Sequence, residues 1–548
     1  MSTKKSEPPP AHAGRLQRSV GFYGLMMVSL GSIIGSGWLL GALNAAERAG
    51  PASVLSWILA AGMLSLLALV YAELGATYPV AGGAARFPYY SHGSVAGFTA
   101  GWASWLQAVF IAPLEVLAAI TYVNSVSWVN QHFNMIYRGG ENAGLLNGTG
   151  LCVAIALMVV FTVINLAGAK FLSDSNIIVV IWKTAVPVLA VGVVAALQFK
   201  PSNFHAGGGF MPFGFHGVFA ALTGGVVFGL QGFEQAVHLA GEARDPKRDL
   251  SRAILVAMAI GAVLYALLQV VMIGALDPAH IAKGWLMPLG GDPSDYGVWY
   301  TLALALGAGW LAKVLLIDAV ISPAGTGVVY LGTTARLSYA LGEEREMPSA
   351  LATTRKGVPV VSILTAAVVG LAAFGPFKSW NSLVSVVTAA TAIMYAFAPV
   401  SLAALHKVDG GRRRSYRVPM PKLALPAAFC SANLIMYWGG FETNWKLGLA
   451  ILGGLALFAI GAWRRRTGAG RAVGNAIWVG PWLGGHVVLG WLGRYGGGRN
   501  ILPNWVDIGV VIVFALAIFY WATALRLSGE DSAVEVAKDA GQIDYEAA

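Results

Sequence analysis

Hydrophobic runs recur along this chain, and each is about 20 residues or more, the length that a helix needs to cross the hydrocarbon core of a bilayer. Only 11% of the 548 residues are charged and 57% are hydrophobic, whereas a soluble domain usually carries about 25% charged residues. Too few ionic groups remain to cover a soluble protein of this size. The sequence therefore predicts an all-α integral membrane protein.

About 14 hydrophobic segments are expected to cross the membrane, with ends uncertain by about 2–4 residues. The eighth segment is too long for one simple crossing, so we expect it to continue as a cytoplasmic helix through Arg336 to Glu344. The segments lie near residues 20–43, 51–75, 96–126, 149–168, 174–198, 216–239, 252–276, 298–341, 361–376, 381–405, 423–440, 447–463, 476–493 and 504–526.

The net charge of +10 does not indicate a nucleic-acid partner, because most Lys and Arg residues fall in alternate loops, as the positive-inside rule predicts. This distribution predicts cytoplasmic N- and C-termini in a multi-pass protein of the cell membrane. The basic runs at residues 412–414 and 464–466 are then expected to anchor cytoplasmic loops near anionic lipid.

Glycine clusters interrupt two of the segments, the first at residues 31–37 and the sixth at residues 223–232. Glycine costs about 1 kcal/mol relative to Ala inside a helix and permits non-helical backbone, so each cluster predicts a break. Unwound backbone at membrane depth is tolerated only where protein or water satisfies its polar groups. The two clusters are five helices apart, which is typical of two inverted five-helix halves that pack around a midplane binding site. The alternative is that the glycines only allow neighbouring helices to pack closely.

The glycine-rich residues 34–37 resemble the signature of the amino acid–polyamine–organocation (APC) transporters, and residues 228–234 resemble the family's sixth helix. The resemblance spans about residues 18–440. The layout is most similar to the bacterial aspartate:proton symporter branch, although residues 231–234 follow the general family pattern. The similarity to this branch rests on residues 35–39, 71–75, 206–214 and 543–545 and on an extra helix pair, whereas residues 241–242 and 245–248 belong to the general family pattern.

The resemblance implies the leucine-transporter-type fold, a 5+5 inverted repeat with broken helices 1 and 6. It divides the chain into a cytoplasmic tail (1–18), a ten-helix transport core (19–405), four additional membrane helices (406–527) and an acidic cytoplasmic tail (528–548). Both tails are expected to be disordered. The last two helices have no function that the sequence reveals, and either dimer contacts or lipid packing would account for them.

An amino acid carries a carboxylate and an ammonium group at a fixed separation. The half-helix that starts near Ser36 would offer free amides and a partial positive charge to the carboxylate, and unpaired carbonyls at the breaks would accept the ammonium. By resemblance, Ser36 and Gly37 hold the carboxylate, and Phe228 is an aromatic gate, with ordinary packing as the alternative. The full set implied for substrate binding is Ile33, Gly35, Ser36, Gly37, Phe228, Gly229 and Gln231, with the carbonyls of Ile33, Phe228 and Gln231 on the amine.

Lys183 lies about ten residues from either membrane face, too deep to reach the interface easily. A buried lysine loses its proton more readily than an exposed one, which would make Lys183 a usable proton carrier. The family places such a lysine where sodium-coupled relatives bind sodium, beside the first break and the eighth helix. A permanently charged structural tie is the alternative.

Other polar residues lie inside predicted membrane segments. Glu115 is a candidate for a proton relay or for an ion pair with Lys313. Lys313 and Asp318 are five residues apart, so they do not share a helix face, and each needs a partner elsewhere. By resemblance Glu234 is structural or gating. The resemblance also implies that Ser322 and Thr326 supply oxygens near Lys183.

The sequence as a whole predicts a secondary transporter that moves an acidic amino acid such as L-aspartate with protons by alternating access. An amino acid or polyamine exchanger is the runner-up. An intramembrane enzyme is disfavoured because no His-Glu-x-x-His motif, Gly-x-Ser-x-Gly motif or Cys/His cluster is found. A channel is disfavoured because no ring of pore-lining polar groups is indicated. We expect no metal, organic cofactor or disulfide; Cys152 and Cys430 both lie in apolar runs.

Overall fold

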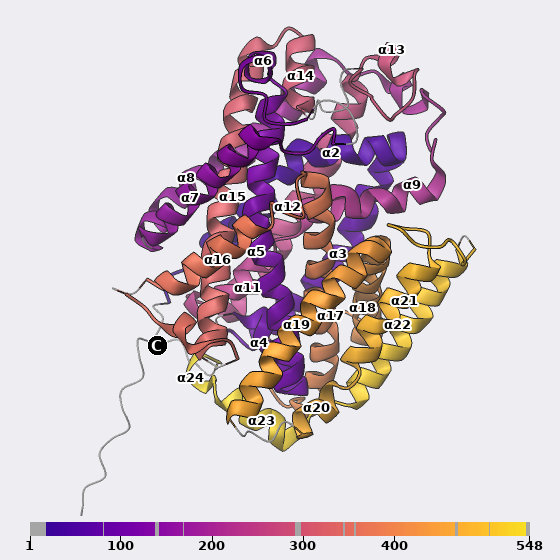
Figure 1. The fold of residues 1–548 in the computed structure, drawn as a ribbon. Coiled ribbons are helices and arrows are strands. Elements are labelled where there is room, and N and C mark those ends of the chain that lie inside the picture. The colour runs from indigo at the N-terminus through magenta and orange to yellow at the C-terminus, as the bar shows by residue number, and fades with distance from the viewer. Residues whose placement is uncertain are drawn as a thin grey trace, which may run out of the picture.

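The computed structural model describes residues 18–80, 82–137, 142–167, 169–290, 297–343, 346–355, 358–465, 470–503 and 505–543. This part of the chain is built from helices, and its only β-structure is isolated bridges such as that between Val20 and Ala243. Figure 1 shows the helices as a tall bundle. We call the end with α6, α13 and α14 the upper end and the end with α20 and α23 the lower end.

Every predicted membrane segment contains at least one helix. The long and medium helices are α1 (Phe22–Ile33), α2 (Ser36–Ala49), α3 (Ser53–Thr77), α4 (Gly83–His92), α5 (Ser94–Asn124), α7 (Gly148–Leu166), α8 (Ala169–Leu197), α9 (Gly214–Ala221), α12 (Pro246–Ala275), α14 (Val298–Ala305), α15 (Gly309–Glu343), α16 (Val360–Ala372), α17 (Trp380–Val408), α18 (Pro421–Trp438), α19 (Gly440–Arg465), α21 (Val479–Leu492), α22 (Val506–Ala524) and α23 (Gly529–Ala537).

The shorter helical elements join these or complete them. They are η1 (Gly50–Ala52), α6 (Ser127–Phe133), η2 (Pro201–His205), the π-helical turn η3 (Leu222–Val226), α10 (Val227–Leu230), α11 (Gln235–His238), η4 (Ala240–Glu242), α13 (Pro278–Ile281), η5 (Ser349–Ala352), α20 (Gly470–Ala476) and α24 (Ala540–Ile543).

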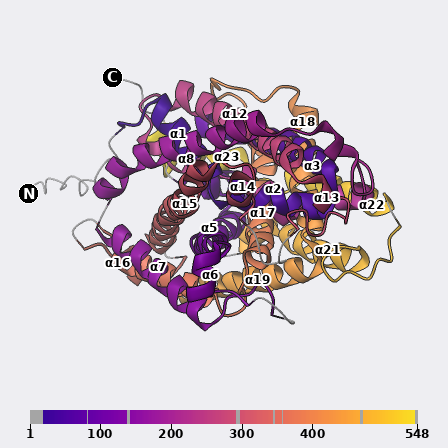
Figure 2. The same ribbon diagram turned by 90° about the horizontal axis from the view of Figure 1, so that it is seen from above.

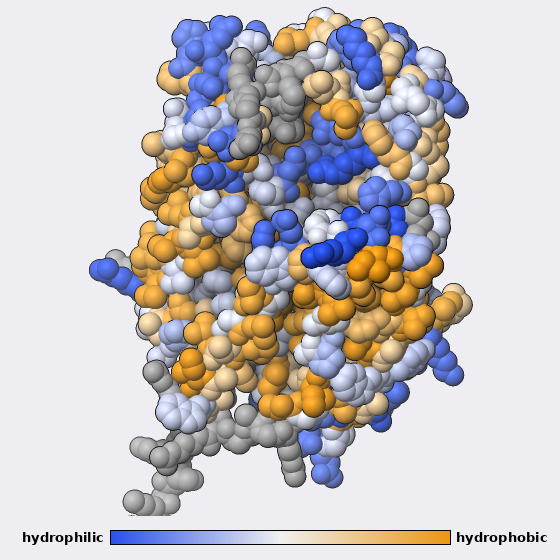
Figure 3. Space-filling model, turned by 45° about the vertical axis from the view of Figure 1, so that its right-hand side comes forward, coloured by the Kyte–Doolittle hydropathy of each residue, from blue (hydrophilic) through white to orange (hydrophobic). Residues whose placement is uncertain are grey.

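Within the described residues, nine helical stretches are long and apolar enough to cross a membrane, and three shorter apolar helices accompany them. One of the nine, Ser36–Thr77, contains both α2 and α3. Hydrophobic side chains cover much of the side of the molecule in Figure 3. An apolar side wall and hydrophobic helices of this length are what a multi-pass membrane protein requires.

Among the nine candidate membrane spans, α5 and α17 are the most buried, with 89% and 94% of their apolar windows inside the protein, whereas the windows of α7 and α19 are only 33% and 22% buried. Seen from above, α2, α5 and α17 lie in the middle, with α7, α16, α19, α21 and α22 around them (Figure 2). The centre of the bundle is therefore formed by helices of the first, third and tenth predicted membrane segments, which are α2, α5 and α17.

Both breaks expected from the glycine clusters are confirmed. Between α1 and α2 the backbone leaves the helical region at Ile34 (φ −90°, ψ 88°) and Gly35 (φ −122°, ψ −140°). The sixth segment ends its helix at Gln231, which is extended, and turns at Gly232 with φ +113°. A conformation with that positive φ is open to glycine at little cost.

The eighth segment is two helices rather than one. Gly307, with φ +74°, separates α14 from α15, and this division was not expected from the sequence. After it, α15 runs unbroken for 35 residues through Arg336 to Glu343, which confirms the expected helical continuation; the expected last residue, Glu344, lies outside the described residues.

The expectation of a disordered acidic tail is wrong for the residues that form α23 and α24. Ser528 caps α23 by accepting from the Asp531 amide, and buried Ser532 donates to the Tyr90 carbonyl at 2.7 Å. Asp539 accepts from the Tyr90 hydroxyl at 2.6 Å and pairs with Arg86 at 3.1 Å. Burial and the Asp539 carboxylate raise the pKa of Tyr90 well above its usual range, so its hydroxyl stays a donor. These contacts bind the tail to α4.

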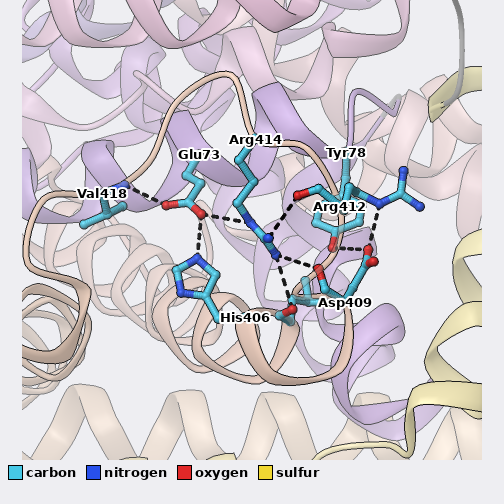
Figure 4. Close-up of polar contacts among 8 residues, drawn as sticks. Glu73, Tyr78, His406, Asp409, Arg412, Arg414 and Val418 are labelled. Carbon is cyan, nitrogen blue, oxygen red and sulfur yellow. Dashed lines mark hydrogen bonds and ion pairs between the residues drawn. The ribbon is translucent and has the colours of Figure 1, made fainter.

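A second polar cluster ties the lower ends of α3 and α17 to the connection that follows α17 (Figure 4). The fully buried carboxylate of Glu73 on α3 accepts from His406 Nε2 at 2.5 Å and from the Val418 amide at 2.7 Å. Arg414 Nε lies 3.1 Å from the same carboxylate. The guanidinium of Arg414 also donates to the carbonyls of Leu405 and Asp409.

This cluster corrects the expected role of residues 412–414. The Arg414 side chain is only 2% exposed and pairs with Glu73, while Arg412 Nε donates to the Asp409 carboxylate at 2.7 Å, which also accepts from Tyr78. Two of the three arginines thus have carboxylate partners within the protein. Only Arg413 is exposed.

We predict that Arg414→Ala destabilises the protein much more than Arg413→Ala. Removing one partner of a buried ion pair costs up to about 3–5 kcal/mol, although His406 and the Val418 amide would still contact Glu73 and reduce that cost. The apparent melting temperature of the detergent-solubilised protein measures the effect. Equal melting temperatures of the two variants would contradict the assignment of Arg414 to the interior.

Candidate functional site

The break between α1 and α2 exposes carbonyl groups at the end of α1, and one of them is bound by a lysine. Lys183 on α8 is 2% exposed, and its Nζ donates to the Gly31 carbonyl at 2.6 Å and to Thr326 Oγ1 on α15 at 2.5 Å. The lysine predicted to lie beside the first break and the eighth helix is therefore in contact with both. Its ammonium joins three helices that are far apart in the sequence.

The amide at the start of α2 is bound by a carboxylate of the protein itself. The Ser36 amide donates to Glu115 Oε2 on α5 at 2.9 Å, and Glu115 is fully buried. Its other oxygen, Oε1, has no hydrogen-bond partner within the described residues. The N-terminus of this half-helix is the place where the sequence leads us to expect the substrate's carboxylate.

Three glycines let the backbones approach around this point. A Cβ on Gly35 would lie 2.7 Å from Glu115 Oε1 and 3.0 Å from Thr326 Oγ1. A Cβ on Gly37 would lie 2.8 Å from the Cα of Gly229, so α2 and α10 touch without side chains between them. The Ile33 carbonyl, expected to hold the substrate's amine, accepts from Tyr265 Oη at 2.9 Å.

The break in the sixth segment carries a buried amide side chain. Gln231 is 2% exposed, and neither Oε1 nor Nε2 has a hydrogen-bond partner within the described residues. The carbonyl of Phe228 accepts from the Gln231 amide at 3.3 Å. The expected contribution of Gln231 was its backbone carbonyl; its free side-chain amide was not foreseen.

Glu234 lies just beyond this break and is fully buried. Its Oε2 accepts from the Gly232 amide at 3.0 Å and from Tyr395 Oη on α17 at 2.6 Å. The carboxylate therefore ties the unwound backbone of the sixth segment to the tenth predicted helix. This placement is compatible with the structural or gating role that the resemblance implies.

A small cavity lies between the two breaks. It has room for roughly one water molecule, so an amino acid can bind there only if the surrounding helices move. Glu115 and Gln231, whose side chains have unsatisfied polar atoms, both line it. Its walls come from α1 and the first break, α5, the sixth segment and α15: Ser32, Ile33, Gly35, Ile111, Glu115, Phe228, Gln231, Thr326 and Tyr330.

The remaining polar residues of the eighth segment separate into two groups. Asp318 is fully buried and accepts from Trp38 Nε1 at 3.1 Å and from Ser322 Oγ at 2.7 Å. Lys313 is exposed, so the alternative pairing of Lys313 with Glu115 is not formed. Asp318 and Ser322 thus form a polar group on α15, while Lys313 points away from the site.

Sequence reasoning missed two aromatic residues of this region. Tyr265 on α12 binds the Ile33 carbonyl, and Trp380 Nε1 on α17 donates to Ser36 Oγ at 3.1 Å. Both lie in apolar helices, where Tyr and Trp are common, so no local pattern marks them. No group of three or more His, Cys, Asp or Glu residues that could hold a metal ion occurs in the part of the chain that the structure describes.

Comparison with known proteins identifies the family. The amino acid permease model matches residues 20–457. The chain is 33% identical over 536 residues to the glutamate/serine transporter AimA of Bacillus subtilis, covering 97% of each chain. It is 32% identical to the aspartate-proton symporter of the same organism, over 93% of this chain and 96% of that one. A branched-chain amino acid permease, BcaP of Bacillus subtilis, is 27% identical over 76% of this chain and 87% of that one.

The broken helices, the polar cavity between them and these matches agree with one another. The chain therefore belongs to the amino acid permease family of the APC superfamily and is a multi-pass membrane transporter rather than an enzyme.

Proposed function

We propose that this permease is a proton-coupled symporter of acidic amino acids, with L-aspartate as the first candidate substrate, and that it works by alternating access. One observation carries the proposal: the first break holds a buried carboxylate on its amide side and a buried ammonium on its carbonyl side. Glu115 binds the Ser36 amide and Lys183 binds the Gly31 carbonyl. Both groups can gain or lose a proton beside the expected substrate position.

The contact of Glu115 with Ser36 suggests how a proton and a substrate are linked. An ionised Glu115 and the substrate's carboxylate would compete for the same helix N-terminus, and two carboxylates at one site repel each other. Protonation of Glu115 removes its charge and weakens its hold on the Ser36 amide. The amide is then free for the substrate, so that binding of the amino acid and of a proton favour each other.

Lys183 supplies the second part of this linkage. While it is charged, it holds the end of α1 against α8 and α15 through Gly31 and Thr326. Loss of its proton would remove the charge from these hydrogen bonds and allow α1 to move. In alternating access such movement of one helix bundle against the other exposes the site to each side in turn.

An acidic side chain on the substrate would need hydrogen-bond donors. The Gln231 amide offers two N–H donors and lines the cavity without a partner among the described residues, and Ser32 and Thr326 add hydroxyl groups. The names of two of the reported relatives include glutamate or aspartate, which also favours an acidic substrate.

The charge distribution supports an orientation in the cell membrane. By the positive-inside rule, the lower end, with Arg86, Arg412, Arg413 and Arg414, would face the cytoplasm. The N- and C-terminal tails would lie on that side, and substrate would reach the cavity from the upper end.

Uptake of radiolabelled aspartate into empty proteoliposomes, with and without an inward proton gradient, tests the proposal. Accumulation driven by the gradient is the expected result. Uptake that requires preloading with another amino acid would replace symport by exchange. No uptake under either condition would remove aspartate as the substrate and call for a screen of other amino acids.

Lys183→Ala should abolish gradient-driven accumulation, because the ammonium that binds Gly31 and Thr326 is lost. Lys313→Ala is the matched control: Lys313 is exposed, and its removal should leave uptake near that of the unchanged protein. Aspartate uptake at a series of external pH values measures both variants. A Lys183→Ala protein with an unaltered pH dependence would rule out the coupling role of the lysine.

Ser36→Leu should weaken binding of every amino acid substrate alike, because the larger side chain fills the space at the start of α2. Binding of several labelled amino acids to the purified variant measures this. Normal binding would place the backbone site elsewhere.

Gly35→Ala should lower uptake by about tenfold, equivalent to about 1.4 kcal/mol. The added methyl group would meet the Glu115 carboxylate at 2.7 Å and Thr326 at 3.0 Å, and must displace one of them. Gly453→Ala is the control, since no atom lies within 4 Å of a Cβ at that helical position. Initial rates of uptake at matched protein amounts distinguish the two, and equal rates would contradict the close packing at Gly35.

A further inference from the structure

Trp380, the first residue of α17, lies against both broken segments. It is only 3% exposed, and its Nε1 donates to Ser36 Oγ at the start of α2 at 3.1 Å. Its ring meets that of Phe228 edge to face, with the ring centres 5.9 Å apart and the planes at 84°. Neither the resemblance to the family nor the residues of the proposed mechanism assign a role to this tryptophan.

The sixth segment is shaped to receive the indole. Gly225 lies in the π-helical turn η3 with φ +132°, and a Cβ there would come within 2.9 Å of the Trp380 ring. Residues with a Cβ rarely adopt this backbone conformation. Glycine at this position therefore permits both the turn and the close approach of the ring. The indole can therefore pack directly against the π-helical turn of the sixth segment.

Trp380 lines one cavity and contacts a residue that lines another. The cavity described above is lined by Glu115 and Gln231, and also by Phe228, which Trp380 touches. A second cavity, toward the upper end, is lined by Trp380 itself together with Leu40, Asn44, Thr121 and Asn381. Helix α5 contributes Ile111 to the first cavity and Thr121, ten residues further on, to the second.

We propose that Trp380 is the upper gate of the substrate site. In the structure described here its indole closes the inner cavity toward the upper cavity, and its release from Ser36 opens the path between them. The assignment of the upper cavity as the side of substrate access rests on the proposed function; the closure itself rests only on the geometry of Trp380.

The hydrogen bond to Ser36 gives this gate a link to the site below it. The Ser36 hydroxyl accepts from Trp380, and the Ser36 amide donates to Glu115. A substrate carboxylate that binds at the start of α2 therefore meets a residue that is already bonded to the gate. A movement of Ser36 would therefore change its hydrogen bond with the indole directly.

Labelling of single cysteines by a membrane-impermeant maleimide tests the gate. In a background with Cys152→Ser and Cys430→Ser, Ile111→Cys reports on the inner cavity and Thr121→Cys on the upper cavity, both from α5. The reagent is added to the face of the membrane from which Thr121→Cys reacts. We expect Trp380→Ala to speed labelling at position 111 by about tenfold, with no change at position 121.

Unchanged labelling at position 111 in the Trp380→Ala protein would overturn the proposal. An equal rise at both positions would also overturn it, because it would indicate general loosening of the fold. Trp380→Phe keeps a ring against Phe228 but lacks the N–H donor, and a rise of a few fold at position 111 is expected. Should Trp380→Ala not fold, an unaltered rate in Trp380→Phe would reject the hydrogen-bonded gate.

These measurements need neither aspartate nor a proton gradient. Failure of the transport proposal would leave the labelling pattern intact, and failure of the gate would leave gradient-driven uptake intact. The two proposals are therefore tested separately.

Discussion

An amide or carbonyl without a partner at membrane depth costs several kcal/mol, and the first break of this permease is organised by that cost. Three of its backbone groups are bound by side chains from three other helices. The Gly31 carbonyl accepts from Lys183 on α8, the Ile33 carbonyl from Tyr265 on α12, and the Ser36 amide donates to Glu115 on α5. The buried charges are thus part of what makes the broken helix stable, and a substrate at this break must replace some of these contacts.

The charges at the site also bear on coupling. A buried ion is stabilised mainly by an opposite charge nearby, because water is absent. The break already contains the ammonium of Lys183 and the carboxylate of Glu115, and Asp318 lies on the same helix as Thr326, the partner of Lys183. An acidic amino acid would bring one more net negative charge into this region. A proton that arrives with it would leave the total charge unchanged, which favours symport over movement of the amino acid alone.

Much of the fold could be predicted because membrane depth restricts the chain to helices and because glycine clusters mark where helices break. The place of Lys183 beside the first break followed from the family pattern, whereas its role in coupling stays a prediction. The contacts between distant helices could not be predicted: nothing near Glu115 in the sequence indicates Ser36, and nothing near Trp380 indicates either break. Arg414 was expected near anionic lipid because its sequence neighbours are basic, yet its partner Glu73 lies far away in the sequence, on α3. The end of the chain was expected to be disordered because it is acidic, whereas its contacts with Arg86 and Tyr90 on α4 lie far away in the sequence.

Ser36 links the upper part of the site to its buried carboxylate. Its hydroxyl accepts from Trp380 and its amide donates to Glu115, so the residue at the start of α2 contacts both the proposed gate and the proposed proton site. In the proposed mechanism, a carboxylate that arrives from the upper cavity would pass the indole before it reaches the amide, and there it would compete with Glu115. Opening of the proposed gate and release of the amide would therefore act on one short stretch of backbone. In a fold of this kind the unwound segment is the natural place for such convergence, because its amides and carbonyls are free to exchange partners without unfolding a helix.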